Sequence, residues 1–256
     1  MIAPDLVDAV VDALTARLGA AHVKTDETSR TIYGTDALKR GRPADVVVFP
    51  ATTEEVAAVV RICAERRVPI VPRGGGTGYT GGSVPSQGGV VVSLERMNRI
   101  LEIDEANLLA IVQPNVITGD LQDAVERVGL FYPPNPASLR QSVIGGNVAE
   151  CAGGPRAFKY GTTKRYVLGL EAVLPTGEII ETGGKVVKNV VGYDLTQLIV
   201  GSEGTLAIIT KIIVRLVPKP PLQQTLRATF RDVESAAAAV INIIRERVVP
   251  AGQGQP

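Results

Sequence analysis

Metal-binding side chains are scarce in this sequence. Its 256 residues include one histidine, His22, and two cysteines, Cys63 and Cys151, which do not have the spacing of metal ligands. We therefore expect no zinc or haem site built from these residue types. The low cysteine content also favours a reduced, cytoplasmic protein over a disulfide-bonded secreted one. Such a protein would meet a membrane only through its partners.

Aromatic side chains and an excess of one charge are lacking as well. There is no tryptophan, aromatic residues make up 4% of the chain, and 27 Lys and Arg against 26 Asp and Glu leave a net charge of +1. Neither a basic surface nor stacking side chains are available, so we expect no nucleic-acid partner. The first 18 residues lack the basic start and the apolar run of a signal peptide or membrane anchor.

Hydrophobic residues, by contrast, make up 45% of the chain and follow regular patterns. The range 6–18 has the apolar spacing of a helix ended by Gly19, laid on the surface of a larger body. The ranges 46–49, 53–67 and 68–71 then predict a strand, a helix and a second strand, a succession typical of a parallel βαβ crossover. In such units a ligand binds at the loop that follows a strand.

The rest of the chain is predicted to be richer in strands. We expect a strand at 90–94, paired strands at 100–103 and 108–112, a helix at 118–128, a hairpin of 166–174 with 178–181, and a long strand at 206–217.

Beyond the prolines at 218–221, apolar and polar residues alternate from Leu222 to Phe230, which predicts a half-buried strand. An apolar stripe from Val233 to Ile244 predicts a helix after it. One strand and one helix cannot enclose a core of their own. We therefore expect a second domain that begins here and is cut short by residue 256.

A glycine cluster follows the predicted βαβ unit. Eight of the sixteen residues from Gly74 to Gly89 are glycine, and the cluster opens with Pro72-Arg73-Gly74-Gly75-Gly76-Thr77-Gly78. Glycines there permit positive φ and a close backbone approach, so that successive N–H groups can converge on phosphate oxygens. The Walker and Rossmann patterns are both absent, which disfavours ATP and NAD bound in those ways. The alternative is a glycine-rich turn without a ligand.

A second glycine cluster argues against that alternative. The segments 142–149 and 151–156 combine paired glycines with small residues, as expected for backbone packed against a flat ligand. A proline-rich segment at 133–138 precedes this cluster, and Gly201-Ser202-Glu203-Gly204 follows it just before a strand.

The order of these motifs resembles the FAD-binding domain of the vanillyl-alcohol oxidase and p-cresol methylhydroxylase (PCMH) family, particularly the FAD subunit of glycolate oxidase and the D-lactate dehydrogenases. The likeness extends from Asp45 to Pro218. It is carried by PRGGGTGYTGG from Pro72, IGGNVAECAGGPRAFKYG from Ile144, KNVVGYDL from Lys188 and GSEGTLAIIT from Gly201. It implies an α+β, PCMH-type FAD-binding fold of two α/β subdomains.

The resemblance implies three segments: 1–42 as an N-terminal helix and polar lead-in, 43–218 as the FAD-binding domain, and 219–256 as the truncated start of the substrate domain. It places the pyrophosphate on Arg73 to Gly78 and the ribityl and isoalloxazine region along 134–149. The implied FAD contacts are Pro72, Arg73, Gly74, Gly75, Gly76, Thr77, Gly78, Pro134, Ser138, Ser142, Gly145, Gly146, Asn147, Ala149, Gly161, Glu203, Gly204 and Ile208.

Departures from the family matter too. Some relatives attach FAD through a histidine in or near the glycine loop, where this chain has Thr77 and Tyr79, so we expect noncovalent FAD. Cys151 could be a flavin tether, but a small buried side chain beside the ligand is favoured. Relatives take substrate-binding histidines and acidic residues from a following domain that this sequence does not contain. No catalytic residue is therefore assigned.

Several charged residues keep two interpretations. One interpretation of Glu203 is a general base. Its flanking glycines favour the other interpretation, a residue that binds the ligand or forms a turn. A group of basic residues either supplies positive charge to a substrate carboxylate or to reduced flavin, or lies on a solvated surface. The group comprises Arg156, Lys159, Lys164, Arg165 and the more distant Lys188.

Three functions remain open at this point. The first is the cofactor half of an enzyme in which FAD accepts a hydride from a small 2-hydroxy acid, with a base supplied from elsewhere. The second is a noncatalytic flavin-binding or interaction subunit that docks on a partner chain. The third, a nucleotide-binding protein without flavin, requires the second glycine cluster to be accidental.

Overall fold

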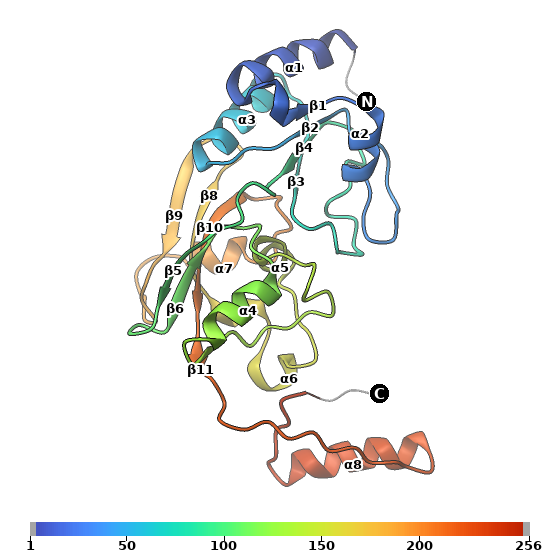
Figure 1. Cartoon of the computed structure of the whole chain (residues 1–256), viewed down its shortest axis with the longest axis vertical. Helices are drawn as coiled ribbons and strands as arrows, with labels where there is room; N and C mark the ends of the chain where they lie inside the picture. Colours follow the sequence, from blue (N-terminus) through green and yellow to red (C-terminus); the bar gives the residue numbers. More distant parts are fainter. Residues whose placement is uncertain (1–3, 253–256) are drawn as a thin grey trace.

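The computed structural model describes residues 4–252, and it shows two α/β lobes that share strands (Figure 1). The start of the predicted first helix at residues 1–3 and the chain end at 253–256 lie outside the described residues. Among the described residues, no helix is long and apolar enough to cross a membrane.

The first lobe is built on a four-stranded sheet in the order β1-β2-β4-β3. Its strands are β1 (Val23–Lys24), β2 (Val46–Val48), β3 (Ile70–Arg73) and β4 (Val90–Ser93). Strands β2 and β3 both run parallel to β4, so the parallel crossover through α3 (Thr53–Glu65) is confirmed. The sequence did not show that β4 lies between the two strands of that crossover, because strand order depends on contacts distant in sequence.

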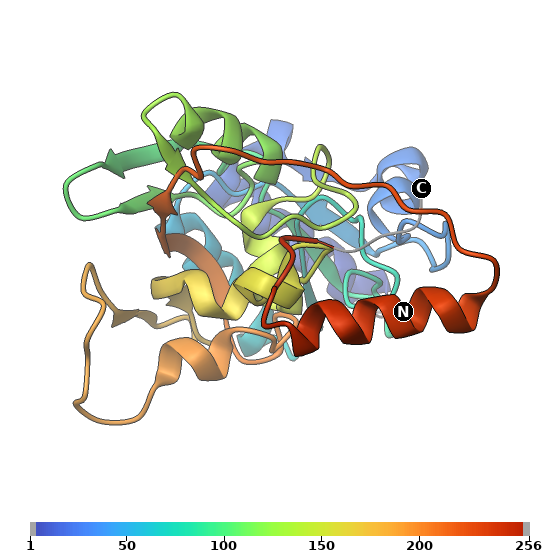
Figure 2. The ribbon, with the colours of Figure 1, turned by 90° about the horizontal axis from the view of Figure 1, so that it is seen from below.

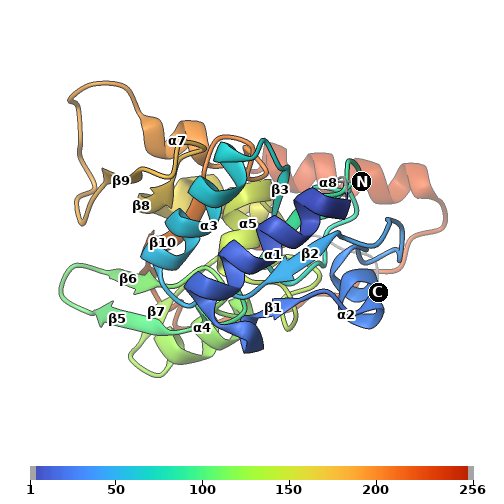
Figure 3. The same cartoon turned by 90° about the horizontal axis from the view of Figure 1, so that it is seen from above.

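Helices cover both faces of this sheet (Figure 3). On one face, α1 (Pro4–Leu18) packs beside α3, and Val10, Leu14 and Val60 join the strands in one core. On the other face, Tyr33 of α2 (Glu27–Tyr33) packs against a smaller core that contains Phe49. We had expected only a polar lead-in around α2, whose start is capped by the Asp26 side chain. A short 3-10 helix, η1 (Ala20–His22), joins α1 to β1.

The second lobe is an antiparallel sheet in the order β5-β6-β10-β8-β9. Both predicted hairpins are confirmed, and helices α4, α5 and α7 add apolar side chains to its core. The elements are β5 (Ile100–Asp104), β6 (Leu109–Val112), α4 (Thr118–Glu126), β7 (Leu130–Phe131), α5 (Ile144–Glu150), α6 (Ala157–Tyr160), η2 (Thr163–Tyr166), β8 (Val167–Val173), β9 (Ile179–Gly183), α7 (Leu195–Ile199), β10 (Ile208–Arg215) and β11 (Val217–Pro218).

One end of the β8–β10 pair belongs to both lobes. Val173 and Ile208 are buried in the core of the first lobe, whereas their chain neighbours Ala172 and Ile209 are buried in the core of the second. In addition, Arg61 of α3 donates through Nη1 to the carbonyl oxygen of Gly177 at 2.8 Å, in the turn that follows β8. The two lobes are thus joined by packing and by hydrogen bonds.

The predicted strand from Leu222 to Phe230 is wrong. These residues are exposed and form no strand, because none of the strands described in this chain lies beside them to pair with their backbone groups. The helix after them is confirmed as α8 (Val233–Arg245), which lies apart from both sheets (Figures 1 and 2). Its apolar stripe is exposed, with Val233 77% and Ile241 50% accessible.

Contrasting burial at the two ends gives a stability test. Leu14 of α1 is fully buried, whereas Leu226 is 94% exposed. We expect Leu14→Ala to lower the free energy of unfolding by about 2–5 kcal/mol, because it leaves a cavity against α3. The matched control Leu226→Ala should leave it unchanged. Urea unfolding followed by circular dichroism measures both, and equal effects would contradict this packing.

Candidate functional site

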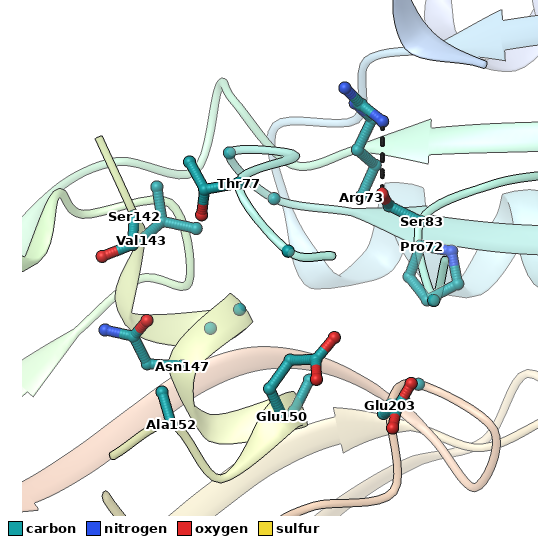
Figure 4. A pocket seen from close by; sticks show the side chains of 18 of the residues that line it. Pro72, Arg73, Thr77, Ser83, Ser142, Val143, Asn147, Glu150, Ala152 and Glu203 are labelled. Atoms are coloured by element: carbon teal, nitrogen blue, oxygen red, sulfur yellow. Dashed lines mark hydrogen bonds between the residues drawn. The ribbon is translucent and has the colours of Figure 1, made fainter. Parts of the chain in front are cut away.

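A cavity of about 390 Å³ lies where the two lobes meet (Figure 4). The glycine loop from Pro72 to Ser83 forms one wall, and the region of α5, from Pro136 to Gly153, forms another. The segment from Glu203 to Ile209, which leads into β10, closes a third side, and Leu94 and Pro114 complete the lining. Both glycine clusters therefore face one space, although about seventy residues separate them.

Sixteen of the eighteen predicted contact residues line this cavity. They are Pro72, Arg73, Gly74, Gly75, Gly76, Thr77, Gly78, Ser138, Ser142, Gly145, Gly146, Asn147, Ala149, Glu203, Gly204 and Ile208. Pro134 and Gly161 do not line it. The Pro134 carbonyl oxygen accepts a hydrogen bond from Gln122 Nε2 at 2.8 Å, and Gly161 has a φ of +86° at the end of α6, packed against Arg165.

Arg73 lines the cavity, but its side chain points away from the α5 wall and holds the glycine loop through hydrogen bonds (Figure 4). Its Nη1 donates to the Thr35 carbonyl oxygen at 2.7 Å and to Ser83 Oγ at 3.4 Å. Gly76 has a φ of +63°, and a Cβ there would collide with the Arg73 guanidinium. Burial lowers the pKa of Arg73. The only cation among the described lining residues therefore positions the glycine loop through its hydrogen bonds.

Two further glycines of the lining, Gly145 and Gly75, have no room for a side chain. A Cβ at Gly145 would lie 2.5 Å from Pro114 Cβ, and one at Gly75 would lie 2.7 Å from the Gln141 carbonyl oxygen. At Gly146 the nearest atom would be Val143 Cγ2, at an ordinary 3.5 Å. The positive φ expected in the first glycine cluster is found at Gly76 but not at Gly75, and Gly146 does not have it either. Gly146 therefore leaves space on the cavity side of α5.

Hydrogen bonds fix the position of α5. Asn147 Nδ2 donates to Thr118 Oγ1 at 2.6 Å, and that hydroxyl lies 3.0 Å from the Ser142 carbonyl oxygen, which it donates to. The Gly145 amide donates to the Pro114 carbonyl oxygen at 2.7 Å. Asn147, a predicted contact residue, is thus partly occupied in anchoring the helix.

Two carboxylates reach the glycine loop from the opposite wall (Figure 4). Glu150 Oε1 accepts a hydrogen bond from Thr80 Oγ1 at 3.0 Å. A Cβ at Gly82 would lie 2.9 Å from Glu203 Oε2 and 3.5 Å from Glu150 Oε1. Glu203 has a φ of +53°, and its amide donates to the Ala149 carbonyl oxygen at 2.9 Å. This geometry fits the turn interpretation of Glu203.

Glu150 was not among the predicted contacts. It follows Gly146 by four residues, so the two share one face of α5, and that spacing was the signal available in the sequence. Cys151 also lines the cavity, at the left-handed end of α5, and its Sγ lies 3.4 Å from Thr162 Oγ1. The basic residues Lys159, Lys164, Arg165 and Lys188 do not line the cavity, and neither does His22.

This lining favours an elongated ligand that is recognised by backbone groups. Glycines leave N–H groups accessible to phosphate oxygens, and the carboxylates can accept hydrogen bonds from hydroxyls. Ala207, Ile208 and Ile209 supply an apolar side. In the described residues, no three His, Cys, Asp or Glu side chains gather as metal ligands.

Comparison with known proteins identifies a matching family. Residues 44–183 match the family described as FAD binding domain. The chain is 51% identical over 234 residues to the glycolate oxidase subunit GlcD of Bacillus subtilis, covering 91% of this chain and 50% of that protein. It is 46% identical over 201 residues to D-lactate dehydrogenase of Archaeoglobus fulgidus, covering 78% and 45%. The chain thus spans about half the length of these relatives.

Solved structures show the same fold. Alkyldihydroxyacetonephosphate synthase superposes with a TM-score of 0.81 at 25% identity, covering 98% of this chain and 47% of that one. For p-cresol methylhydroxylase with bound substrate, the TM-score is 0.75 at 24% identity, covering 86% and 45%. The predicted α+β, PCMH-type fold of two subdomains is confirmed.

The residues present fit FAD. A backbone-lined cradle that a Cβ at Gly146 would fill suits a flat group, and the glycine loop opposite it suits phosphates. We expect Gly146→Val to weaken FAD binding by about ten- to a hundredfold, because its methyl groups would enter that space. Gly75→Val should weaken binding as well, by displacing the loop from Gln141. FAD titration followed by flavin fluorescence measures the dissociation constants.

The matched control is Gly184→Val, a site at the end of β9 where a Cβ meets nothing within 4 Å. It should bind FAD like the unsubstituted chain. Full FAD affinity in both the Gly75 and Gly146 variants would mean that the ligand lies elsewhere.

Proposed function

This chain belongs to the FAD binding domain family, and we propose that it is the FAD-binding portion of a flavin-dependent oxidoreductase that acts on a small 2-hydroxy acid. The cofactor is FAD. The observation that carries the proposal is the cavity where both glycine clusters meet. The substrate class rests on relatives named glycolate oxidase subunit, D-lactate dehydrogenase and D-2-hydroxyglutarate dehydrogenase.

We propose that the sixteen predicted residues lining the cavity hold the cofactor, and we leave out Pro134 and Gly161. Backbone N–H groups from Arg73 to Gly78 would bind the pyrophosphate, with Arg73 fixing the loop from behind. The surface from Ser138 to Ala149 would face the ribityl chain and the isoalloxazine ring. The carboxylates of Glu150 and Glu203 are suited to accept hydrogen bonds from ribose or ribityl hydroxyls.

When bound, FAD supplies the acceptor for a hydride from the hydroxyl-bearing carbon of the substrate. The residues of this chain orient the cofactor, and Ile208 and Ile209 keep water from the side of the cavity where β10 begins. The described lining contains neither a histidine nor a lysine that could remove the hydroxyl proton. The two carboxylates of the lining, Glu150 and Glu203, face the glycine loop. We therefore propose that the base comes from outside the residues that line the cavity.

The C-terminal part has the features expected of a docking element. Residues 222–230 are exposed and form no strand, and the apolar stripe of α8 is exposed as well. We propose that 43–218 is the FAD-binding domain, with 1–42 as its lead-in, and that 219–256 begins a substrate domain. We also propose a cytoplasmic location and partner subunits. The alternative function is a noncatalytic flavin-binding subunit that docks on a partner chain.

The first test concerns the flavin linkage. We expect one FAD per chain without a covalent bond, since no histidine lies in or near the glycine loop. Acid precipitation should leave the yellow colour in the supernatant. Colour that stays with the pellet would contradict this, and Cys151, which lines the cavity, would then be the first residue to substitute.

The second test concerns activity. We expect this chain alone to bind FAD, but we expect the bound flavin to be reduced only slowly by glycolate, D-lactate or similar acids. Positioning of the substrate lowers the barrier by about several kcal/mol, and we propose that the residues that supply it lie outside the cavity. Anaerobic bleaching of the flavin absorbance measures the rate, with dithionite as the positive control. Rapid bleaching by any of these acids at micromolar concentration would show that the chain is catalytically complete. Slow bleaching by all of these acids, with full bleaching by dithionite, would show that the chain binds FAD but does not catalyse the oxidation by itself.

A further inference from the structure

Strand β10 contains an extra residue next to the cavity. Ile209 is opposite Ala172 of β8, and Lys211 is opposite Glu171, so Thr210 has no partner residue. This is a β-bulge, a feature that changes the direction of neighbouring side chains. Ile208 and Ile209, directly before the bulge, both line the cavity although they enter different cores.

The carboxylate of Glu171 holds this bulge. Glu171 Oε1 accepts a hydrogen bond from Thr210 Oγ1 at 2.9 Å, and Oε2 accepts one from Lys211 Nζ at 3.0 Å. The side chain of Glu171 is only 18% exposed. Burial alone would raise the pKa of Glu171, but these hydrogen bonds and one from Thr53 outweigh burial and lower it. The lowered pKa favours the charged form of Glu171, which accepts all three of these hydrogen bonds.

The same carboxylate reaches the other lobe. Glu171 Oε1 also accepts a hydrogen bond from Thr53 Oγ1 at 2.6 Å, and Thr53 is the first residue of α3. Helix α3 leads into β3, which in turn leads into the glycine loop. The Glu171 side chain therefore connects α3, which precedes the glycine-loop wall, with β10, which forms the apolar wall.

We propose that Glu171 is a positioning residue for FAD: it holds the bulge at Thr210 and ties it to α3, so that the two walls of the cavity keep their separation. It does not line the cavity, so its effect on FAD passes through β10 and α3. The inference rests on the proposal that FAD binds in this cavity. It goes beyond that proposal because Glu171 belongs to none of the segments in which FAD contacts are expected.

The hydroxyl groups give the sharpest test, because valine has nearly the shape of threonine and serine keeps the hydroxyl. We expect Thr210→Val, Thr53→Val and Glu171→Gln each to raise the dissociation constant of FAD about tenfold, the change expected if the two walls keep their binding-competent separation in only about a tenth of the molecules. Thr210→Ser and Thr53→Ser should retain near-normal affinity. The constants come from titrating apoprotein with FAD and following flavin fluorescence, at a temperature where circular dichroism shows every variant folded.

A matched control uses the outer partner of the same lysine. Lys211 Nζ also lies 3.1 Å from Glu181 Oε1, on a side chain that is 74% exposed. Glu181→Gln removes that ion pair without touching the bulge, so FAD affinity should not change. The visible circular dichroism of the bound flavin should change in Thr210→Val and stay the same in Glu181→Gln.

The outcomes separate this inference from the proposed function. If the unsubstituted chain binds FAD and the valine variants bind it equally well, Glu171 has only a structural role and the inference is overturned. A lower melting temperature with unchanged FAD affinity leads to the same conclusion. If the unsubstituted chain binds no FAD at all, the cavity assignment fails, and the inference fails with it. Should Glu171→Gln not fold, the threonine variants alone decide the question.

Discussion

Two hydrophobic cores share the end of one strand pair, and the position of the cavity depends on that sharing. Neighbouring residues of β8, Ala172 and Val173, enter different cores, and so do Ile209 and Ile208 of β10. The lobes cannot separate without exposing these side chains to water. The space between them is therefore part of the folded structure before a ligand arrives.

Ten of the described residues that line the cavity are glycines. Gly145 permits α5 to approach Pro114, and Gly146 leaves the facing side of that helix open. Arg73, within the glycine loop, donates hydrogen bonds to the Thr35 carbonyl oxygen and to Ser83 Oγ and so holds the loop in place. Affinity for a phosphate group in such a site depends on how well the N–H groups are aimed, and hence on everything that holds the loop in place.

Much of this could be predicted from local sequence. The hairpins and the parallel crossover follow from patterns a few residues long, and sixteen cavity residues follow from glycine clusters and the family resemblance. What depends on distant contacts was missed. The insertion of β4 between β2 and β3, the direction of the Arg73 side chain and the bulge at Thr210 are set by neighbours far along the chain. The strand expected at 222–230 failed for the same reason, since alternation indicates a strand only where another strand can pair with it.

A wall defined by missing side chains has an evolutionary consequence. At Gly75, Gly76 and Gly145, any substitution adds atoms where a neighbouring residue already lies. Under the proposed function, mutation there is expected to disrupt FAD binding and not to adjust it gradually. Relatives of this chain nonetheless carry names that refer to different hydroxy acids. If FAD binds as proposed, we expect a change of substrate to come from residues other than these glycines.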